Sequence, residues 1–292
     1  KNGKPKEIRR YAAVDEDDLS REAKVLALLR ERFADWQREG FIPSKAIPER
    51  GAETDRLFRE RGWTHWHHMF TPRQLLVHGE FAKRFFSEPR SKQLAAAGQL
   101  TLGRFANWNS RICQWLQSQG GGIGGGKATF ANQALNTLSN YSIRPMTALG
   151  TSVLSVDAVI GQFSEAKIEL ADARDIREIC DLWITDPPYA DAVNYHELGD
   201  FFLAWYDKHL PKAFPEWLPD ARAQLAVRGD GEGFRRSMVE IYKNLARHMP
   251  DNGLQMVMFT HQDPAVWADL GMILWAAGLK ATAAWTISTE TE

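Results

Sequence analysis

The stretch 181–189, which reads Asp-Leu-Trp-Ile-Thr-Asp-Pro-Pro-Tyr, indicates both the fold class and the position of a functional site. Its first half is a short apolar run, typical of a buried strand. Asp186 follows the expected end of that strand, and ligands of open parallel sheets bind at the carboxyl ends of the strands. The second half of the stretch is therefore a candidate binding or catalytic site.

The residues after this strand combine hydrogen-bond acceptors with an aromatic ring. Pro187 and Pro188 lack N–H groups and fix two φ angles, which leaves a stiff turn with carbonyl acceptors. Asp186 adds a carboxylate, and Tyr189 adds a flat face on which a planar base can stack. The complementary ligand is an aromatic ring with an exocyclic amine. An ordinary Asp-Pro turn is the alternative, but the position directly after an apolar strand favours a functional site.

After residue 150, short apolar runs alternate with segments of helical periodicity. Strands are expected at 167–170, 181–185, 254–259 and 280–287, and helices at 197–209, 234–248 and 264–277. Such alternation predicts an α/β fold with a largely parallel sheet covered by helices. Doubly wound sheets usually carry roughly six or more strands, so this segment supplies about half of one.

Residues 1–150 have the pattern of a mainly helical region. Apolar residues recur at three- and four-residue steps between 17 and 39, which predicts an amphipathic helix with Gly40 as its stop. A second helix is expected to begin with Thr71 as N-cap and Pro72 in the first turn. The six glycines between Gly120 and Gly126 predict a flexible loop. A domain boundary is therefore expected near residue 150.

Composition excludes several classes of protein. The 36 Lys and Arg residues balance 37 acidic residues, so no overall basic field indicates nucleic-acid binding, and DNA contacts would need local patches. The two cysteines, Cys113 and Cys180, fit neither a disulfide framework nor a zinc site, which suits a reducing cytoplasm. The longest apolar runs are too short to span a membrane. We expect neither a metal site nor membrane insertion.

The segment Thr185-Asp186-Pro187-Pro188-Tyr189 resembles the catalytic motif of S-adenosylmethionine-dependent amino-methyltransferases, which modify adenine N6 or cytosine N4. The run 185–205 resembles, more narrowly, adenine-specific DNA methylases that carry an insert similar to a zinc ribbon. That likeness rests on Asp191, Asn194, Tyr195, Asp200, Phe201, Phe202 and Trp205. Segments 70–76 and 133–135 are also similar to this family. The chain looks like the C-terminal part of such an enzyme.

This resemblance implies a partial doubly wound, Rossmann-like methyltransferase sheet at 151–292, preceded at 1–150 by a helical region for target recognition or an insert. It also implies DNA as partner and S-adenosylmethionine as cofactor, and it favours adenine N6 over cytosine N4. Asp186 and the carbonyl of Pro187 would orient the target amine toward the cofactor methyl, beside Pro188. The flipped base would be contacted by Tyr189, Asn194 and Tyr195. The cofactor would be contacted by Asp172 and Asp186, with Asp175 as the alternative to Asp172.

The chain departs from the family pattern in three places. An aromatic-x-Gly-x-Gly cofactor turn and the zinc-ribbon cysteines are absent from these residues, and both are expected upstream of Lys1. Ala190 also replaces the second aromatic residue that often follows the motif tyrosine. A non-catalytic DNA- or partner-binding fragment without a complete cofactor site is therefore the alternative function.

Four weaker patterns have simpler interpretations. Residues 121–127 have the glycine and lysine spacing of a phosphate-binding loop, but Ala128 replaces its Ser or Thr, and no apolar strand precedes it. The cluster His65, His67 and His68 lacks accompanying metal ligands, which favours an aromatic turn. Charged residues beside a helix start, here Arg228, Arg235 and Arg236, are usually a solvated face. Tryptophans eight residues apart on a helix, here Trp267 and Trp275, are expected in the core.

Overall fold

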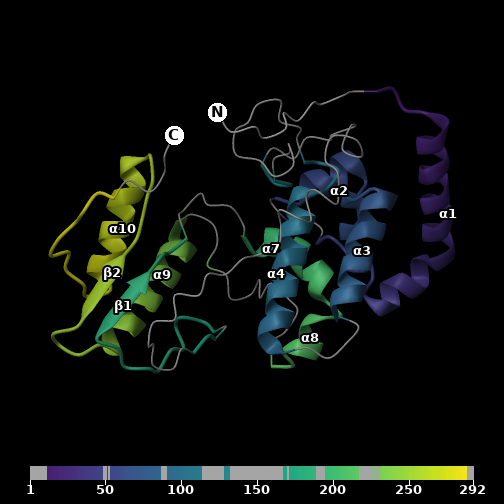
Figure 1. Cartoon of the computed structure of the whole chain (residues 1–292). Helices are drawn as coiled ribbons and strands as arrows, with labels where there is room; N and C mark the ends of the chain where they lie inside the picture. The colour runs from purple at the N-terminus through teal and green to yellow at the C-terminus, as the bar shows by residue number, and fades with distance from the viewer. Residues whose placement is uncertain are drawn as a thin grey trace, which may run out of the picture. The chain divides into compact units, whose positions relative to one another are not determined.

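The chain forms a mixed α/β structure that is mostly helical in the part the structure describes (Figure 1). This computed structural model describes residues 12–48, 51, 53–86, 91–113, 128–131, 167–169, 171–188, 195–216, 227 and 231–287. Two compact units result. The helical unit comprises Lys1–Ala158 and Glu197–Ala221, and the sheet unit comprises Val159–His196 and Arg222–Glu292. The sequence predicted a single boundary near residue 150, whereas Glu197–Ala221 also belongs to the helical unit.

The helical unit is built from α-helices and one 3-10 helix, and side-chain caps fix the starts of some of them. They are α1 (Glu16–Glu39), α2 (Asp55–Arg61), the 3-10 helix η1 (Trp66–Met69), α3 (Pro72–Phe86), α4 (Lys92–Trp108), α7 (Tyr195–Tyr206) and α8 (Leu210–Ala213). Asp15 caps α1 by accepting from the N–H of Asp18 at 2.8 Å. The Oγ1 of Thr71 accepts from the N–H of Gln74 at 3.3 Å, which confirms the expected start of α3.

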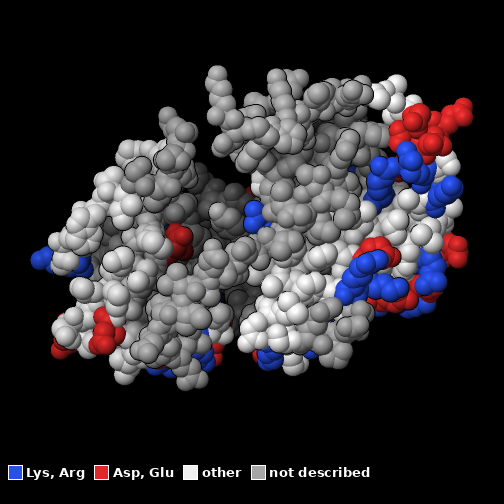
Figure 2. Space-filling model, in the orientation of Figure 1, with Lys and Arg blue, Asp and Glu red and all other residues white. Residues whose placement is uncertain are grey.

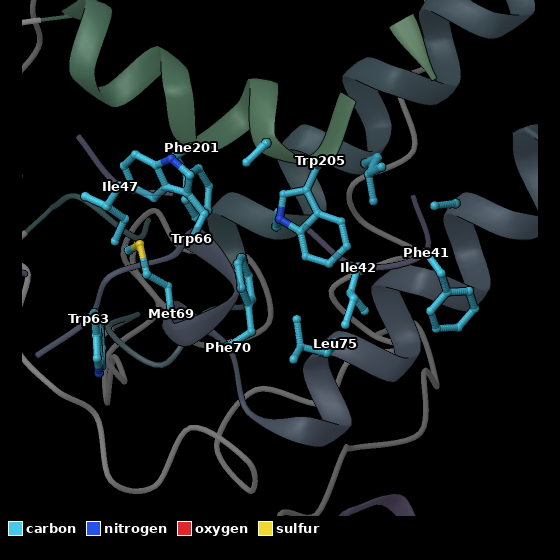
Figure 3. Close-up of a cluster of buried hydrophobic side chains, with 14 of the residues drawn as sticks. Phe41, Ile42, Ile47, Trp63, Trp66, Met69, Phe70, Leu75, Phe201 and Trp205 are labelled. Carbon is cyan, nitrogen blue, oxygen red and sulfur yellow. The ribbon is translucent and has the colours of Figure 1, made fainter. Parts of the chain in front are cut away.

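A single aromatic-rich core holds the helical unit together (Figure 3). Phe70 stacks on Phe201 with ring centroids 5.7 Å apart and meets Trp205 edge-on at 5.2 Å. Trp66 is fully buried and meets Phe201 in a T-shaped arrangement. Because aromatic side chains bury large areas, these contacts dominate the packing. Helix α7 thus completes a core that begins more than a hundred residues earlier in the chain.

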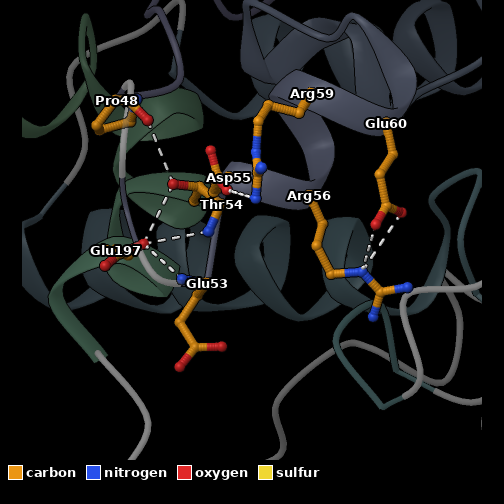
Figure 4. Close-up of polar contacts among 8 residues, drawn as sticks. All are labelled: Pro48, Glu53, Thr54, Asp55, Arg56, Arg59, Glu60 and Glu197. Atoms are coloured by element: carbon orange, nitrogen blue, oxygen red, sulfur yellow. Dashed lines mark hydrogen bonds and ion pairs between the residues drawn. The ribbon is translucent and has the colours of Figure 1, made fainter.

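A buried carboxylate fixes the start of α7 to the residues that precede α2 (Figure 4). The Oε2 of Glu197 accepts from the N–H of Glu53 at 3.0 Å, and from the N–H and Oγ1 of Thr54 at 3.1 Å each. A Cβ atom at Gly51 would lie only 2.1 Å from the same oxygen. One turn further along α7, Asp200 pairs with Lys45 at 2.6 Å. Two acidic side chains therefore bind α7 to the N-terminal segment.

The sheet unit contains two parallel strands packed against helix α9. Strands β1 (Leu182–Thr185) and β2 (Leu254–Val257) pair from Leu182↔Leu254 to Thr185↔Val257. Helices α9 (Gly231–Arg247) and α10 (Pro264–Ala276) pack against each other (Figure 1). The buried face of α9, whose residues pack with Trp183 and Val257, consists of Phe234, Met238, Tyr242 and Leu245. Two of the four strands expected in this part of the sequence, at 181–185 and 254–259, are thus present, as are the three expected helices, with small shifts at their ends.

The other face of this small sheet is apolar and exposed. Leu182, Ile184, Leu254 and Met256 are 47%, 57%, 62% and 47% exposed, respectively. They alternate with the half-buried residues that face α9, as successive side chains of a strand must. Parallel sheets usually have both faces covered, so an exposed apolar face is unusual for a parallel sheet.

Three expectations for the sheet unit are wrong. Residues 280–287 are exposed and form no strand. Residues 167–169, which belong to the strand expected at 167–170, also form no strand. A strand requires a partner for its backbone groups, which local sequence alone does not provide. Trp267 and Trp275 are 47% and 72% exposed, whereas Leu270 and Ile273 form the buried face of α10. Since α10 is apolar around most of its circumference, periodicity did not identify the side that packs on α9.

Charges of both signs are interspersed on the surface of α1 (Figure 2). Local pairs such as Arg21 with Asp18 account for part of this pattern. Such exposed pairs contribute little to stability. No helix in the described ranges is both long and apolar enough to cross a membrane.

Replacing Glu197 with Gln is expected to destabilise the helical unit by about 1–2 kcal/mol. The substitution removes the charge that strengthens three hydrogen bonds and places an amide near existing donors. Urea unfolding of the whole chain measures the loss. Glu60→Gln is the matched control, because Glu60 forms only an exposed pair with Arg56. Equal stability of the two variants would contradict the role of Glu197.

Acidification is expected to destabilise the helical unit through buried histidines. Burial lowers the pKa of His78 from 6.5 to about 3 and that of His67 to about 4. Between the pKa of each buried histidine and 6.5, the unfolded chain therefore binds more protons than the folded chain. The free energy of unfolding falls as pH decreases through this window, by about 1.4 kcal/mol per pH unit for each histidine. Urea unfolding at pH 7.5 and 5.5 tests this. His78→Gln should lower stability at both pH values but reduce the difference between them; an unchanged difference would contradict the assignment.

Candidate functional site

The Asp-Pro-Pro segment begins directly after β1, at the carboxyl edge of the parallel sheet. The backbone pairing continues to this edge, where the carbonyl of Thr185 accepts from the N–H of Met258 at 2.8 Å. Asp186 and Pro188 are exposed, whereas Pro187 is buried. The turn is thus anchored by Pro187 and by the end of β1, with the Asp186 residue on the accessible side.

A buried tyrosine on α9 supports this turn from the protein interior. The Oη of Tyr242 lies 3.2 Å from the Oγ1 of Thr185, the residue before Asp186. Burial, together with the negative charge of Asp186, raises the pKa of Tyr242, so its hydroxyl remains protonated. Tyr242 was not among the site residues predicted from the sequence. Its only signal is the helical spacing with Met238 and Leu245 on the buried face of α9.

The loop after β2 lies at the same edge, because β1 and β2 run parallel and in register. Its backbone is held by several short contacts. The Nε1 of Trp267 donates to the carbonyl of His261 at 2.9 Å, and the ring of Trp267 meets Phe259 edge-on at 5.0 Å. Asp263 caps α10 by accepting from the N–H of Ala265 at 2.8 Å. This loop therefore has a defined conformation at the edge of the sheet where the Asp-Pro-Pro turn begins.

Asp172, the expected cofactor contact, forms a closed ion pair with its neighbour Arg174. Its two carboxylate oxygens accept from the Nε of Arg174 at 2.9 and 3.1 Å and from Nη2 at 2.5 Å. This hydrogen bonding lowers the pKa of Asp172. Asp175, the alternative, is exposed. The carboxylate of Asp172 is therefore engaged within its own loop, and the adenine of a cofactor would have to share it with Arg174.

Asn244 of α9 fixes the loop that carries Asp172. Its Nδ2 donates to the carbonyls of Ala173 and Ile176, each at 3.0 Å, and the residue is only 7% exposed. Two hydrogen bonds from one buried amide define the loop conformation. No sequence pattern indicated this role, because Asn is common on exposed helical faces.

The remaining candidate residues divide into three groups. Tyr189 and Asn194 lie outside the described residues, as do the glycine-rich segment and Arg228, while Tyr195 is 73% exposed at the start of α7. Arg235 and Arg236 form exposed ion pairs with Asp269 and Glu240. His65, His67 and His68 form an aromatic cluster, and the described side chains contain no metal-binding group of three or more His, Cys, Asp or Glu residues.

Comparison with known proteins gives no relative. No family model, no curated protein and no solved structure matches this chain.

Replacing Asn244 with Ala is expected to loosen the loop 171–177. The carbonyls of Ala173 and Ile176 would lose their donor, at a cost of about 1–3 kcal/mol to the sheet unit. Hydrogen exchange followed by mass spectrometry should show faster exchange in this loop. Lys243→Ala, at the adjacent exposed position of α9, is the control. Unchanged protection of the loop in Asn244→Ala would show that other contacts hold it.

Proposed function

We propose that this chain carries the amine-orienting site of an S-adenosylmethionine-dependent DNA methyltransferase that acts on adenine N6. The observation that carries the proposal is the position of Asp186-Pro187-Pro188 immediately after a strand of a parallel sheet, at its carboxyl edge. Under this proposal the two strands belong to a Rossmann-like sheet. The resemblance of residues 185–205 to adenine-specific DNA methylases supports adenine over cytosine.

The chemistry that the proposal requires is placement of an amine. The sulfonium of the cofactor is already a strong electrophile, so the protein has to orient the amine lone pair and to stabilise the positive charge that develops on nitrogen. Asp186 and the carbonyl of Pro187 would accept the two amine hydrogens. Tyr189 would stack on the base, with Asn194 and Tyr195 nearby, after the base has left the duplex. Buried Pro187 and the hydroxyl of Tyr242 would keep the turn rigid.

A non-catalytic module that binds DNA or a protein partner is the second candidate function. The ion pair between Asp172 and Arg174 favours it, because the expected cofactor contact is already occupied. Calorimetric titration of S-adenosylmethionine into a protein that contains this chain separates the two candidates. Binding that weakens in Asp172→Ala, and not in Asp175→Ala, supports the enzyme; absence of binding supports the module.

Replacing Asp186 with Ala is expected to reduce methyl transfer to DNA by at least about 100-fold, because the amine loses its charged acceptor. The assay follows labelled methyl transfer from S-adenosylmethionine in a protein that contains this chain. Asp181→Ala is the matched control, since Asp181 is also exposed and lies just before β1. Circular dichroism should be unchanged in both variants.

Two outcomes of this assay would contradict the proposal. One is full turnover by Asp186→Ala, which would remove the amine-orienting role. The other is the absence of methylated bases when DNA treated with the unmodified protein is digested to nucleosides. Mass analysis of those nucleosides also distinguishes N6-methyladenine from N4-methylcytosine.

A further inference from the structure

The helical unit contains a pocket that has no part in the methyl-transfer proposal. It has a volume of about 310 Å³, at the lower end of the range for small-molecule sites. Its apolar wall comes from α1, from Phe70 just before α3 and from α3 itself, and it consists of Leu29, Phe33, Phe70 and Leu75. Its polar side comes from His68 and Arg111. The lining therefore combines apolar side chains with side chains that can donate hydrogen bonds.

Arg111 gives this pocket an uncompensated positive charge. Its guanidinium lies over the ring of Trp63 at 5.0 Å, and its Nη1 donates to the carbonyl of His68 at 3.2 Å. Arg61 lies over the same ring at 5.2 Å. Burial and the charge of Arg61 lower the pKa of Arg111. Within the described ranges no carboxylate forms an ion pair with Arg111, so an anion in the pocket would supply the missing counter-charge.

The two histidines of the pocket have different roles. The Nδ1 of His68 accepts from the N–H of Thr64 at 3.2 Å, so the neutral ring carries its proton on Nε2 and is a donor there. Burial, with the charges of His68 and His65, lowers the pKa of His67 to about 4. At neutral pH the His67 ring is uncharged, and it meets Phe33 edge-on at 5.1 Å. His68 thus adds a donor beside Arg111, and His67 extends the aromatic wall.

We propose that this pocket binds a small organic anion, with its carboxylate or phosphate held by Arg111 and His68 and its flat apolar body against Phe33, Phe70 and Leu75. Arg111 is suited to this task because a planar guanidinium binds such oxyanions through paired hydrogen bonds. The stacking on Trp63 holds that guanidinium in place before a ligand arrives. The inference concerns the helical unit alone, and it stands whether or not the sheet unit transfers methyl groups.

A matched pair of probes tests the charge requirement. Naphthalene-2-carboxylate and the neutral naphthalene-2-carboxamide have nearly the same shape, and calorimetry on the whole chain compares their affinities. We expect the carboxylate to bind at least about tenfold more tightly, and Arg111→Gln to remove that preference. Arg104→Gln, at an exposed position of α4, should keep it. Equal affinity for the two probes, or no binding of the carboxylate, would overturn the proposal.

The position of binding is tested on the unmodified chain, so that it does not depend on the stability of the Arg111 variant. Methyl signals in NMR spectra report each leucine separately. The carboxylate should shift Leu29 and Leu75 in the pocket and leave Leu182 and Leu254 on the exposed sheet face unchanged. Shifts confined to Leu182 and Leu254 would show that the probe binds the apolar face of the sheet unit, and would overturn the proposal.

Discussion

The buried carboxylate of Glu197 is the interaction on which the arrangement of the helical unit depends. Its three donors belong to Glu53 and Thr54, which precede it by more than 140 residues. A buried carboxylate without donors would cost several kcal/mol, so α7 can pack only where the residues before α2 supply them. Because α7 carries Phe201 and Trp205, this polar contact also positions the largest side chains of the core.

Helix α7 also begins where the chain passes from the sheet unit back into the helical unit. The Asp-Pro-Pro turn ends the sheet unit's first strand, and α7 begins a few residues later within the segment where the chain passes back into the helical unit. Residues 185–205, on which the resemblance to DNA methylases rests, therefore divide between two physical roles. Thr185, Asp186 and Pro187 form the edge of the sheet, whereas Asp200, Phe201 and Trp205 are buried and stabilise the helical unit. Similarity over such a run can therefore reflect packing as well as chemistry.

The sequence was sufficient where local physics decides the structure, and insufficient where a distant partner decides it. The cap at Thr71 and the strands on either side of α9 were predicted, because capping and apolar runs are local signals. The buried face of α10, the unpaired segment 280–287, and the contacts made by Asn244 and Tyr242 depend on which surface packs against them. The position of Asp186 was predicted for the first reason. The pairing of Asp172 with Arg174 was missed although Arg174 is only two residues away, because either acidic residue in that loop fits the local pattern.

The two candidate sites have opposite hydrogen-bonding character, which determines what each can bind. The turn after β1 presents a carboxylate and the carbonyls of a proline pair, which lacks N–H groups, so it suits a ligand with hydrogens to donate. The pocket beside η1 is lined by Arg111 and His68, whose guanidinium and Nε2–H are hydrogen-bond donors, so it suits a ligand that accepts. The exocyclic amine of a base carries no negative charge to pair with Arg111, and a carboxylate in place of that amine would be repelled by Asp186. The turn after β1 therefore selects a hydrogen-bond donor, and the pocket selects an acceptor.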